Sequence, residues 1–330
     1  MRVTRSATEP RIRIDVLVDE ADRRAELYDT TFWSLRGTPK ELPPVWLYDE
    51  RGSRLFEEIT RLPEYYPTGA EREILAAHSA EIADLTGART LVELGAGTSE
   101  KTLSLLDALA AAGTLERFVP LDVSEEVMRA SAEAIAARYP SIGVHGLVGD
   151  FERDLPAIPD GGGRLIAFLG STVGNLYPAG RAGLFRAVAS ALTPGDAFLL
   201  GIDLVKDPAV IEAAYNDSRG VTERFVRNGL TVVNRTLGGD FEQSRFGFEA
   251  FWDAGREWMD IGFRSLEAQT VRIEELETAV PFAAGERLRF EVSTKFRREV
   301  IEAELVAAGL RPSTWWTDPA GRFALLLAER

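Results

Sequence analysis

A repeated exchange between short apolar segments and helix-like segments, beginning near residue 89, most constrains the fold of this chain. The apolar segments are strand-sized and nearly continuous, as expected for strands buried on both faces. The segments between them are about 12 residues long, which fits the crossover helices of a parallel sheet. Right-handed crossovers then give an α/β fold with a doubly wound sheet. Strands are expected over residues 90–94, 118–121, 144–148, 165–169 and 198–204, and helices over 100–111, 125–137 and 181–192.

This alternation of expected strands and helices stops after Lys206 and resumes near the C-terminus. Residues 207–285 mix Asn, Arg and aromatic side chains without a regular pattern, which is typical of an inserted subdomain. After the insertion we expect strands over 288–294 and 323–328 and a helix over 299–308, so that a final strand pair could complete the sheet. We therefore predict a smaller domain formed by residues 1–70 and 206–295 and an α/β domain formed by residues 71–205 and 296–330.

The N-terminal part of the chain is less regular. Residues 1–35 are polar and weakly patterned, and we expect a loosely structured lead-in that could include a helix. A helix is expected over 53–62, before the helix-breaking run PEYYP. Thr68 and Glu71 have the spacing of a capping box and predict the start of another helix.

Composition excludes several classes of function. With 38 basic and 52 acidic residues, the net charge is −14, which disfavours nucleic acid as a partner. No cysteine is present, which excludes thiolate catalysis and Cys-ligated metals, and two histidines cannot form a three-His metal site, so no metal is expected. No apolar run approaches the ~20 residues that span a bilayer, and the N-terminus lacks the apolar core of a secretory signal. We expect a cytoplasmic monomer that does not bind membranes.

The strongest local motif is the turn after the first expected strand of this rhythm, where Gly95 and Gly97 occur in the run ELGAGTSEKT. Glycines there let the backbone approach a ligand at the carboxyl end of a parallel strand. A dinucleotide fingerprint would have a third glycine where this chain has Glu100, whose carboxylate would face a pyrophosphate. This disfavours an NAD-dependent oxidoreductase. S-adenosylmethionine (SAM) has no phosphate and carries two cationic groups, and it suits the loop better.

Acidic residues follow the next two expected strands. Asp122, which lies 25 residues after Gly97, could accept both ribose hydroxyls. Asp150 could accept from the adenine amino group while Phe151 packs on the ring. Taken alone, the glycines could form a tight turn and the carboxylates could cap strand ends. Their occurrence at successive strand ends favours a SAM site.

Several longer runs closely resemble the histidine Nα-methyltransferases of ergothioneine biosynthesis, the SAM-dependent enzymes that make hercynine. The most specific are TRLPEYYP and GTSEKT. The resembling runs are residues 42–49, 59–68, 92–102, 168–176, 201–207 and 315–321. The resemblance extends from residue 36 to the C-terminus, and only the first 35 residues match poorly. It implies a class I SAM-methyltransferase fold (a Rossmann-like doubly wound sheet) with a second, smaller α+β substrate-binding domain, formed by the N-terminal segment and the insertion.

The resemblance also implies roles for individual residues. The positions that match SAM contacts in the family are Gly95, Lys101, Asp122, Asp150 and Phe151, beside Gly97 in the same loop. The positions that match substrate contacts are Asn175 and Tyr215 for the α-carboxylate and α-amine, and Tyr65, Glu291 and Ser293 for the imidazole. Tyr48 falls beside the amine that is methylated, and is the catalytic candidate.

One position departs from the family pattern, which has Met near the substrate ring where this chain has Ile261. Ile261 could reshape the pocket or fill the same volume, and we favour the second. Glu291 favours histidine, because an imidazole N–H left without an acceptor would be costly. We therefore expect SAM-dependent Nα-trimethylation of L-histidine to hercynine, the first step of ergothioneine biosynthesis. The alternatives are α-N-methylation of another free amino acid such as tryptophan or tyrosine, and a non-catalytic SAM-binding scaffold, which the retained substrate positions disfavour.

These residues suit the chemistry that the resemblance implies. Methyl transfer from a sulfonium releases a neutral group and needs no acid for it, whereas the amine must be unprotonated. Tyr48, directly or through a water, is expected to accept or relay the amine proton. Its ring could also face the methylated ammonium by cation–π attraction.

Overall fold

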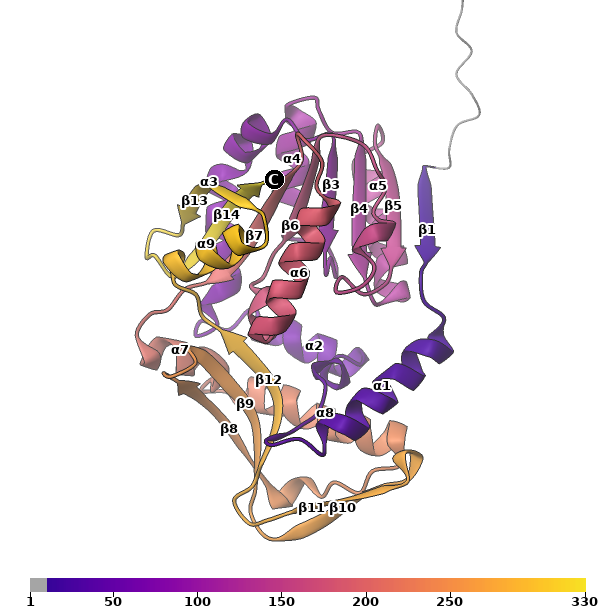
Figure 1. Ribbon diagram of the computed structural model, residues 1–330, viewed down its shortest axis with the longest axis vertical. Helices are drawn as coiled ribbons and strands as arrows, with labels where there is room; N and C mark the ends of the chain where they lie inside the picture. Colours follow the sequence, from indigo (N-terminus) through magenta and orange to yellow (C-terminus); the bar gives the residue numbers. More distant parts are fainter. Residues whose placement is uncertain (1–10) are drawn as a thin grey trace, which may run out of the picture.

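The computed structural model describes residues 11–330 and contains two main sheets (Figure 1). The strands of the larger sheet are β1 (Ile12–Val16), β3 (Thr90–Leu94), β4 (Arg117–Asp122), β5 (Gly143–Val148), β6 (Arg164–Phe168), β7 (Ala197–Asp203), β13 (Arg311–Thr317) and β14 (Phe323–Glu329). Their order is β1-β5-β4-β3-β6-β7-β14-β13. The first six in this order run parallel, whereas β14 is antiparallel to both β7 and β13.

Helices cover both faces of the larger sheet. They are α3 (Tyr66–Thr86), α4 (Leu103–Ala111), α5 (Glu125–Arg138), α6 (Pro178–Ala191) and α9 (Arg298–Ala307). Two apolar clusters separate these faces: one holds residues of α3, α4 and α5, and the other holds residues of α6 and α9. Adjacent residues of β3 point to opposite sides, since Leu91 belongs to the first cluster and Val92 to the second. Burial on both sides explains why these strands are nearly continuous apolar runs.

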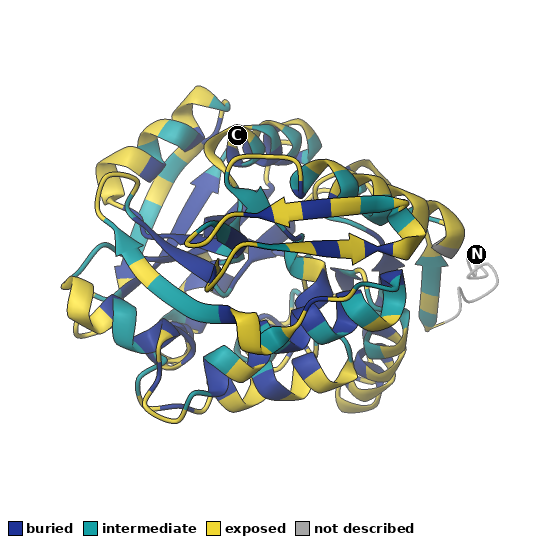
Figure 2. Cartoon of the chain, turned by 90° about the horizontal axis from the view of Figure 1, so that it is seen from below, coloured by how far each residue is buried: buried dark blue, intermediate teal, exposed yellow. Residues whose placement is uncertain are grey.

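The smaller sheet has the order β2-β12-β9-β8 and its own apolar cluster, which includes Trp46, Phe225 and Phe263. Its strands are β2 (Lys40–Glu41), β8 (Phe246–Asp253), β9 (Trp258–Ser265) and β12 (Arg287–Thr294), beside the hairpin of β10 (Gln269–Ile273) and β11 (Thr278–Phe282). The helices of this part are α1 (Glu20–Ser34), α2 (Glu50–Ile59), α7 (Pro208–Tyr215) and α8 (Val221–Leu237). Figure 2 shows that buried positions gather in the interior strands and exposed positions on the outer faces of helices.

Short 3₁₀ segments complete the chain. They are η1 (Pro44–Leu47), η2 (Leu155–Ala157), η3 (Thr172–Asn175), η4 (Gln243–Arg245) and η5 (Glu274–Leu276). The two parts of the molecule meet where β12 ends, because Phe296 bridges to Leu204 just beyond β7. No helix among residues 11–330 is both long enough and apolar enough to cross a membrane.

The predicted strands and helices of residues 90–204 are confirmed to within a few residues. The strand expected over 323–328 is β14, but the one expected over 288–294 is β12 of the smaller sheet, and β14 pairs instead with β13, which was not predicted. In the described part of residues 1–35, the helix that the prediction included is present as α1, whereas the loose structure expected around it is wrong. Strand β1 pairs in parallel with β5, with Ile12 opposite Val144, and Asp19 caps α1 by accepting from the backbone N–H of Ala21. Residues 1–10 of that prediction lie outside the described residues.

The predicted capping box is also wrong. Helix α3 begins at Tyr66, two residues before Thr68, and no side chain caps it. Pro67 in the first turn supplies a preset φ and needs no N–H partner there. The carboxylate of Glu71 is therefore available for other contacts, which are described below. The helix expected from residue 100 begins at Leu103.

The domain division remains a prediction, but the structure bears on two of its boundaries. Strand β1 lies in the larger sheet, although residues 1–70 are assigned to the smaller domain. Helix α3 continues across the boundary between residues 70 and 71. The chain thus leaves the larger part after β1 and returns to it with α3, so that residues 1–70 contribute to both parts.

Candidate active site

The glycine loop after β3 lies against the end of β4. Gly95 and Gly97 have φ values of 66° and 50°, the left-handed region that glycine adopts without strain. The carboxylate of Asp122 accepts from the backbone N–H of Gly97 at 2.8 Å and from that of Ser124 at 3.0 Å. Asp122 therefore holds the glycine loop against the end of β4, and its carboxylate lies at the same edge of the sheet as the loop.

The space beside this loop suits the nucleoside part of SAM. A Cβ on Gly97 would meet no atom within 4 Å, and a Cβ on Gly95 would lie 4.0 Å from Cε1 of Phe151. The ring of Phe151 packs on Phe168, with centroids 4.9 Å apart. Asp150 precedes it, and its Oδ1 accepts from the backbone N–H of Glu152 at 2.8 Å. An aromatic ring, bare backbone and carboxylates thus meet at one edge of the sheet.

Lys101 is held by a residue whose role the sequence did not reveal. The carboxylate of Glu71, with 0% of the residue exposed, lies 2.9 Å from the Lys101 ammonium and accepts from the backbone N–H of Gly170 at 2.6 Å. Gly170 has a φ of 76°, and a Cβ there would lie 2.9 Å from Lys101 Nζ. The signal that could have revealed Glu71 is an acidic residue three positions before Ile74, on the buried face of α3.

A second carboxylate is buried beneath the glycine loop. Glu93 in β3 accepts from the hydroxyl of Thr102, and its other oxygen has no hydrogen-bond partner among the described residues. Burial raises the pKa of Glu93 to about 8, although Thr102 and Ser99 act in the opposite direction. Glu93 is therefore mostly protonated at neutral pH, and the ion pair of the loop is the one between Glu71 and Lys101.

Four of the six residues predicted to contact the substrate line one pocket in the smaller part. Its lining includes Tyr48, Tyr65, Tyr215, Ile261 and Glu291. Ile261 and Glu291 are direct partners across β9 and β12. Burial raises the pKa of Glu291 to about 7, while the positive charge of Lys295 acts to lower it. Glu291 is thus the one carboxyl group among the described residues that line this pocket, beside the hydroxyls of its tyrosines and of Thr222.

Of the other two predicted substrate residues, Ser293 lies beside this pocket, and Asn175 belongs to a segment that packs on the same strand, β12. The hydroxyls of Ser293 and Tyr215 are 2.9 Å apart, which links Ser293 to the lining. Asn175 ends η3, which packs closely on β12, since a Cβ on Gly174 would lie 2.8 Å from the Thr294 carbonyl oxygen. Within residues 11–330 the Asn175 side chain makes no hydrogen bond, so its amide is available to a ligand.

Tyr48 stands at the mouth of the pocket. Its ring contacts Phe225 and Phe56, with centroids 5.3 and 5.8 Å away, and 43% of the residue is exposed. Water therefore reaches one side of the ring while protein surrounds the rest. Desolvation in the cleft, together with the charge of Glu291, raises the pKa of the Tyr48 phenol well above its ordinary value. The phenol is neutral at physiological pH.

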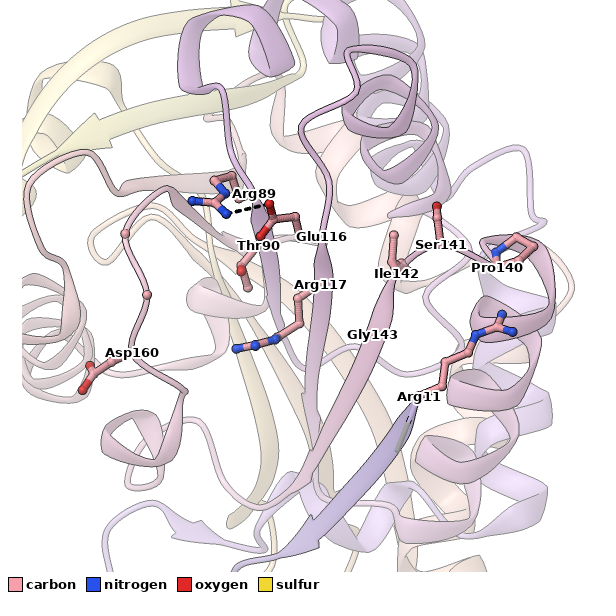
Figure 3. Close-up of a pocket in the computed structure, with 12 residues that line it drawn as sticks. Arg11, Arg89, Thr90, Glu116, Arg117, Pro140, Ser141, Ile142, Gly143 and Asp160 are labelled. Atoms are coloured by element: carbon pink, nitrogen blue, oxygen red, sulfur yellow. Dashed lines mark hydrogen bonds and ion pairs between the residues drawn. The ribbon is translucent and has the colours of Figure 1, made fainter. Parts of the chain in front are cut away.

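A larger hollow lies elsewhere on the molecule (Figure 3). Its walls include Thr90, Arg117 and Gly143, which are the first residues of β3, β4 and β5. It is therefore at the amino ends of the parallel strands, opposite the glycine loop. Ligands of doubly wound sheets bind at the carboxyl ends, so the smaller pocket is the better candidate for chemistry.

A doubly wound sheet with a glycine loop after a central strand, carboxylates after the next strands and an adjoining pocket lined by tyrosines defines a SAM-dependent methyltransferase. The family model described as histidine-specific methyltransferase, SAM-dependent, matches residues 27–330. The chain belongs to this family, and its fold is that of the class I methyltransferases.

Two named relatives, identified by sequence, agree with this assignment. The chain is 53% identical to a histidine N-alpha-methyltransferase of Mycolicibacterium smegmatis, over 90% of this chain and 92% of the relative. It is 52% identical to the histidine N-alpha-methyltransferase of Mycobacterium tuberculosis, with the same coverage of each chain. Among solved structures, the CcbJ methyltransferase from Streptomyces caelestis matches with a TM-score of 0.46 and 16% identity, over 82% of this chain and 97% of that one.

Proposed function

We propose that this enzyme transfers three methyl groups from SAM to the α-amine of L-histidine and so forms hercynine, the first step of ergothioneine biosynthesis. One observation carries the choice of substrate: Glu291, which is partly buried, is the one carboxyl group among the described residues of a pocket lined mainly by aromatic and apolar side chains. An imidazole N–H would satisfy it, whereas a purely apolar ring would leave it unpaired and costly. The named relatives support the same reaction.

The residues of the larger part bind the methyl donor in this proposal. SAM supplies an electrophilic methyl group on a sulfonium, whose departure leaves a neutral thioether. The backbone at Gly95 and Gly97 gives it close access, and the Asp122 carboxylate accepts from its ribose. The ring of Phe151 packs on the adenine, and Asp150 accepts from the amino group. Lys101, held by Glu71, is placed for the carboxylate of SAM.

The residues of the smaller part orient the amino acid. Asn175 and Tyr215 hold the α-carboxylate and α-amine, while Tyr65, Glu291 and Ser293 hold the imidazole. Holding both ends of the substrate aligns the amine nitrogen with the methyl group, and such orientation supplies much of the acceleration of a displacement. The Asn175 amide makes no hydrogen bond among the described residues, which supports its role, because it offers donors and an acceptor side by side.

Tyr48 assists the amine in this proposal. As a neutral phenol it accepts a hydrogen bond from the amine, or from a water that carries the proton to the open side of the cleft. Its partly exposed ring also leaves room for a nitrogen that gains methyl groups, and the ring face attracts the final quaternary ammonium.

The remaining features of the proposal concern the whole protein. We propose that it acts in the cytoplasm as a monomer, without a metal and without a nucleic-acid or membrane partner. The acidic composition and the lack of cysteine support this view.

The deciding experiment is a mass-spectrometric assay with SAM and each of the twenty amino acids. An adenosylhomocysteine nucleosidase is added so that the product does not inhibit the enzyme. Histidine is expected to gain one, two and three methyl groups in succession. Methylation of tryptophan or tyrosine in place of histidine would instead assign the pocket to those substrates, with Ile261 as the residue to test. No turnover of any amino acid would contradict the proposed function.

A further inference from the structure

Lys295 is a buried lysine next to the substrate pocket, at a position with no assigned role. It follows directly after β12, and its side chain has 0% exposure. Its ammonium lies 2.7 Å from the Tyr215 hydroxyl, 2.9 Å from that of Ser293 and 2.9 Å from Oδ2 of Asp203. An ammonium has three N–H donors and no acceptor, so these three partners use all of them. Lys295 therefore has no donor left for the substrate itself.

This arrangement fixes the direction of the hydroxyl groups. Because Lys295 can only donate, the oxygens of Tyr215 and Ser293 both act as acceptors towards it. Each hydroxyl still has one hydrogen, and their separation of 2.9 Å places one of these two hydrogens between them. The other hydrogen is not used between these two hydroxyls, and Tyr65, which also hydrogen-bonds Tyr215, competes with a ligand for it. The pair thus offers one O–H donor to whatever occupies the adjoining pocket.

We propose that Lys295 is a positioning residue that, together with Ser293, makes the Tyr215 hydroxyl a charge-supported donor to the α-carboxylate of the substrate. This inference rests on the proposed function only in its choice of histidine, since every free α-amino acid carries that carboxylate. The ammonium charge polarises the hydroxyls that accept from it, which strengthens their donation to an anion. Its charge also favours the ionised form of Glu291, as noted above.

The same cluster contains a matched control residue. Asp203 pairs on its other side with Lys206, 2.5 Å from Oδ1, and accepts from the Tyr66 hydroxyl at 2.8 Å. Lys206 also contacts the Tyr66 hydroxyl, but no hydrogen bond joins it to Tyr215 or Ser293 within the described residues. Two buried lysines thus share one carboxylate, and only one of them contacts the pocket hydroxyls. Because Lys206 remains, removing Lys295 does not leave Asp203 without a cation.

The test compares Lys295→Met with Lys206→Met in binding and turnover. Binding of L-histidine and of L-histidinamide, which lacks the carboxylate charge, is measured by calorimetry with adenosylhomocysteine present. Lys295→Met is expected to weaken L-histidine binding roughly 10- to 100-fold, the usual effect of losing a hydrogen bond to a charged group, with much less effect on the amide. KM for L-histidine should rise more than kcat falls. Lys206→Met should bind both ligands nearly as the parent enzyme does.

Three results would overturn the inference. They are unchanged L-histidine binding in Lys295→Met, an equal loss for the acid and the amide, and an equal loss in Lys206→Met. If Lys295→Met fails to fold, Lys295→Gln keeps a polar group in the site without the charge, and the same comparison applies. If the parent enzyme methylates a different amino acid, that amino acid and its amide replace the histidine pair. The substrate proposal then fails while this one is still tested.

Discussion

Glu291 and Ile261 face each other across the antiparallel pair β12–β9, and both side chains line the pocket that holds Tyr48, Tyr65 and Tyr215. Directly opposed residues project to the same face of a sheet, so the carboxylate and the apolar side chain contact the same occupant. We therefore expect Glu291 to accept from a ring N–H of the substrate and Ile261 to pack on the ring itself.

The first prediction separates these two contributions. Glu291→Gln should lower kcat/KM for L-histidine roughly 10- to 100-fold, because a hydrogen bond to a charged group contributes about 1.5–3 kcal/mol. Ile261→Met should change it less than about tenfold, because swaps between apolar residues of similar volume cost less than about 1.5 kcal/mol. Initial rates of methyl transfer provide the measurement. A larger loss in Ile261→Met than in Glu291→Gln would show that ring shape dominates recognition.

The pH dependence of the reaction should report on Glu291. With a pKa of about 7, this carboxyl is about one-tenth ionised at pH 6 and about nine-tenths ionised at pH 8. The ratio of kcat/KM between the parent enzyme and Glu291→Gln should thus rise several-fold from pH 6 to pH 8. Taking the ratio cancels the titration of the substrate's own amine and imidazole. A ratio that stays flat over this range would mean that Glu291 does not change protonation there.

Tyr48→Phe should affect the methyl steps unequally. The variant keeps the ring but loses the hydroxyl, so proton removal from the amine should slow by roughly 10-fold or more, within the usual range for an assisting group. Mono- and dimethylated histidine should then accumulate, which mass spectrometry of the reaction time course would detect. Tyr28→Phe is a suitable control, because Tyr28 lies in α1 and contacts the carbonyl of Thr236. Unchanged rates for all three steps in Tyr48→Phe would remove its catalytic role.

Glu71→Gln tests whether Glu71 positions Lys101 and the loop at Gly170 for binding of the cofactor. The substitution leaves Lys101 without its partner and weakens the contact with the Gly170 N–H, so adenosylhomocysteine should bind about 5- to 50-fold more weakly. Calorimetry measures this affinity, and the melting temperature should fall as well. Glu100→Gln is the control, because Glu100 is adjacent to Lys101 but exposed. Equal affinity losses in the two variants would indicate a general charge effect rather than a specific support.

The strands β3 to β7 could be predicted from the sequence, because burial on both faces leaves a local apolar run at each. Strand β1 could not, because it depends on pairing Ile12 with Val144, more than a hundred positions away, and its own burial is only partial. Glu71 was assigned to a cap because the N–H of Gly170 that it accepts from lies 99 positions further along the chain. The pocket residues came from the resemblance, and no local pattern connects Tyr48 with Glu291. The role of Lys295 likewise could not be predicted, because it depends on contacts with Asp203 and Tyr215, which belong to other elements of the fold.

The last prediction concerns Glu93 and the pH dependence of stability. Its pKa is raised to about 8 in the folded state, whereas an ordinary Glu has a value near 4.5. Between these values the folded protein binds more protons at this site than the unfolded chain, so the free energy of unfolding falls as pH rises from 4.5 to 8. Glu93→Gln removes that cost. Its melting temperature relative to the parent should increase between pH 5 and pH 9, by an amount corresponding to up to about 4 kcal/mol. Glu100→Gln should show no such trend, and a constant difference for Glu93→Gln would mean that Glu93 titrates alike in both states.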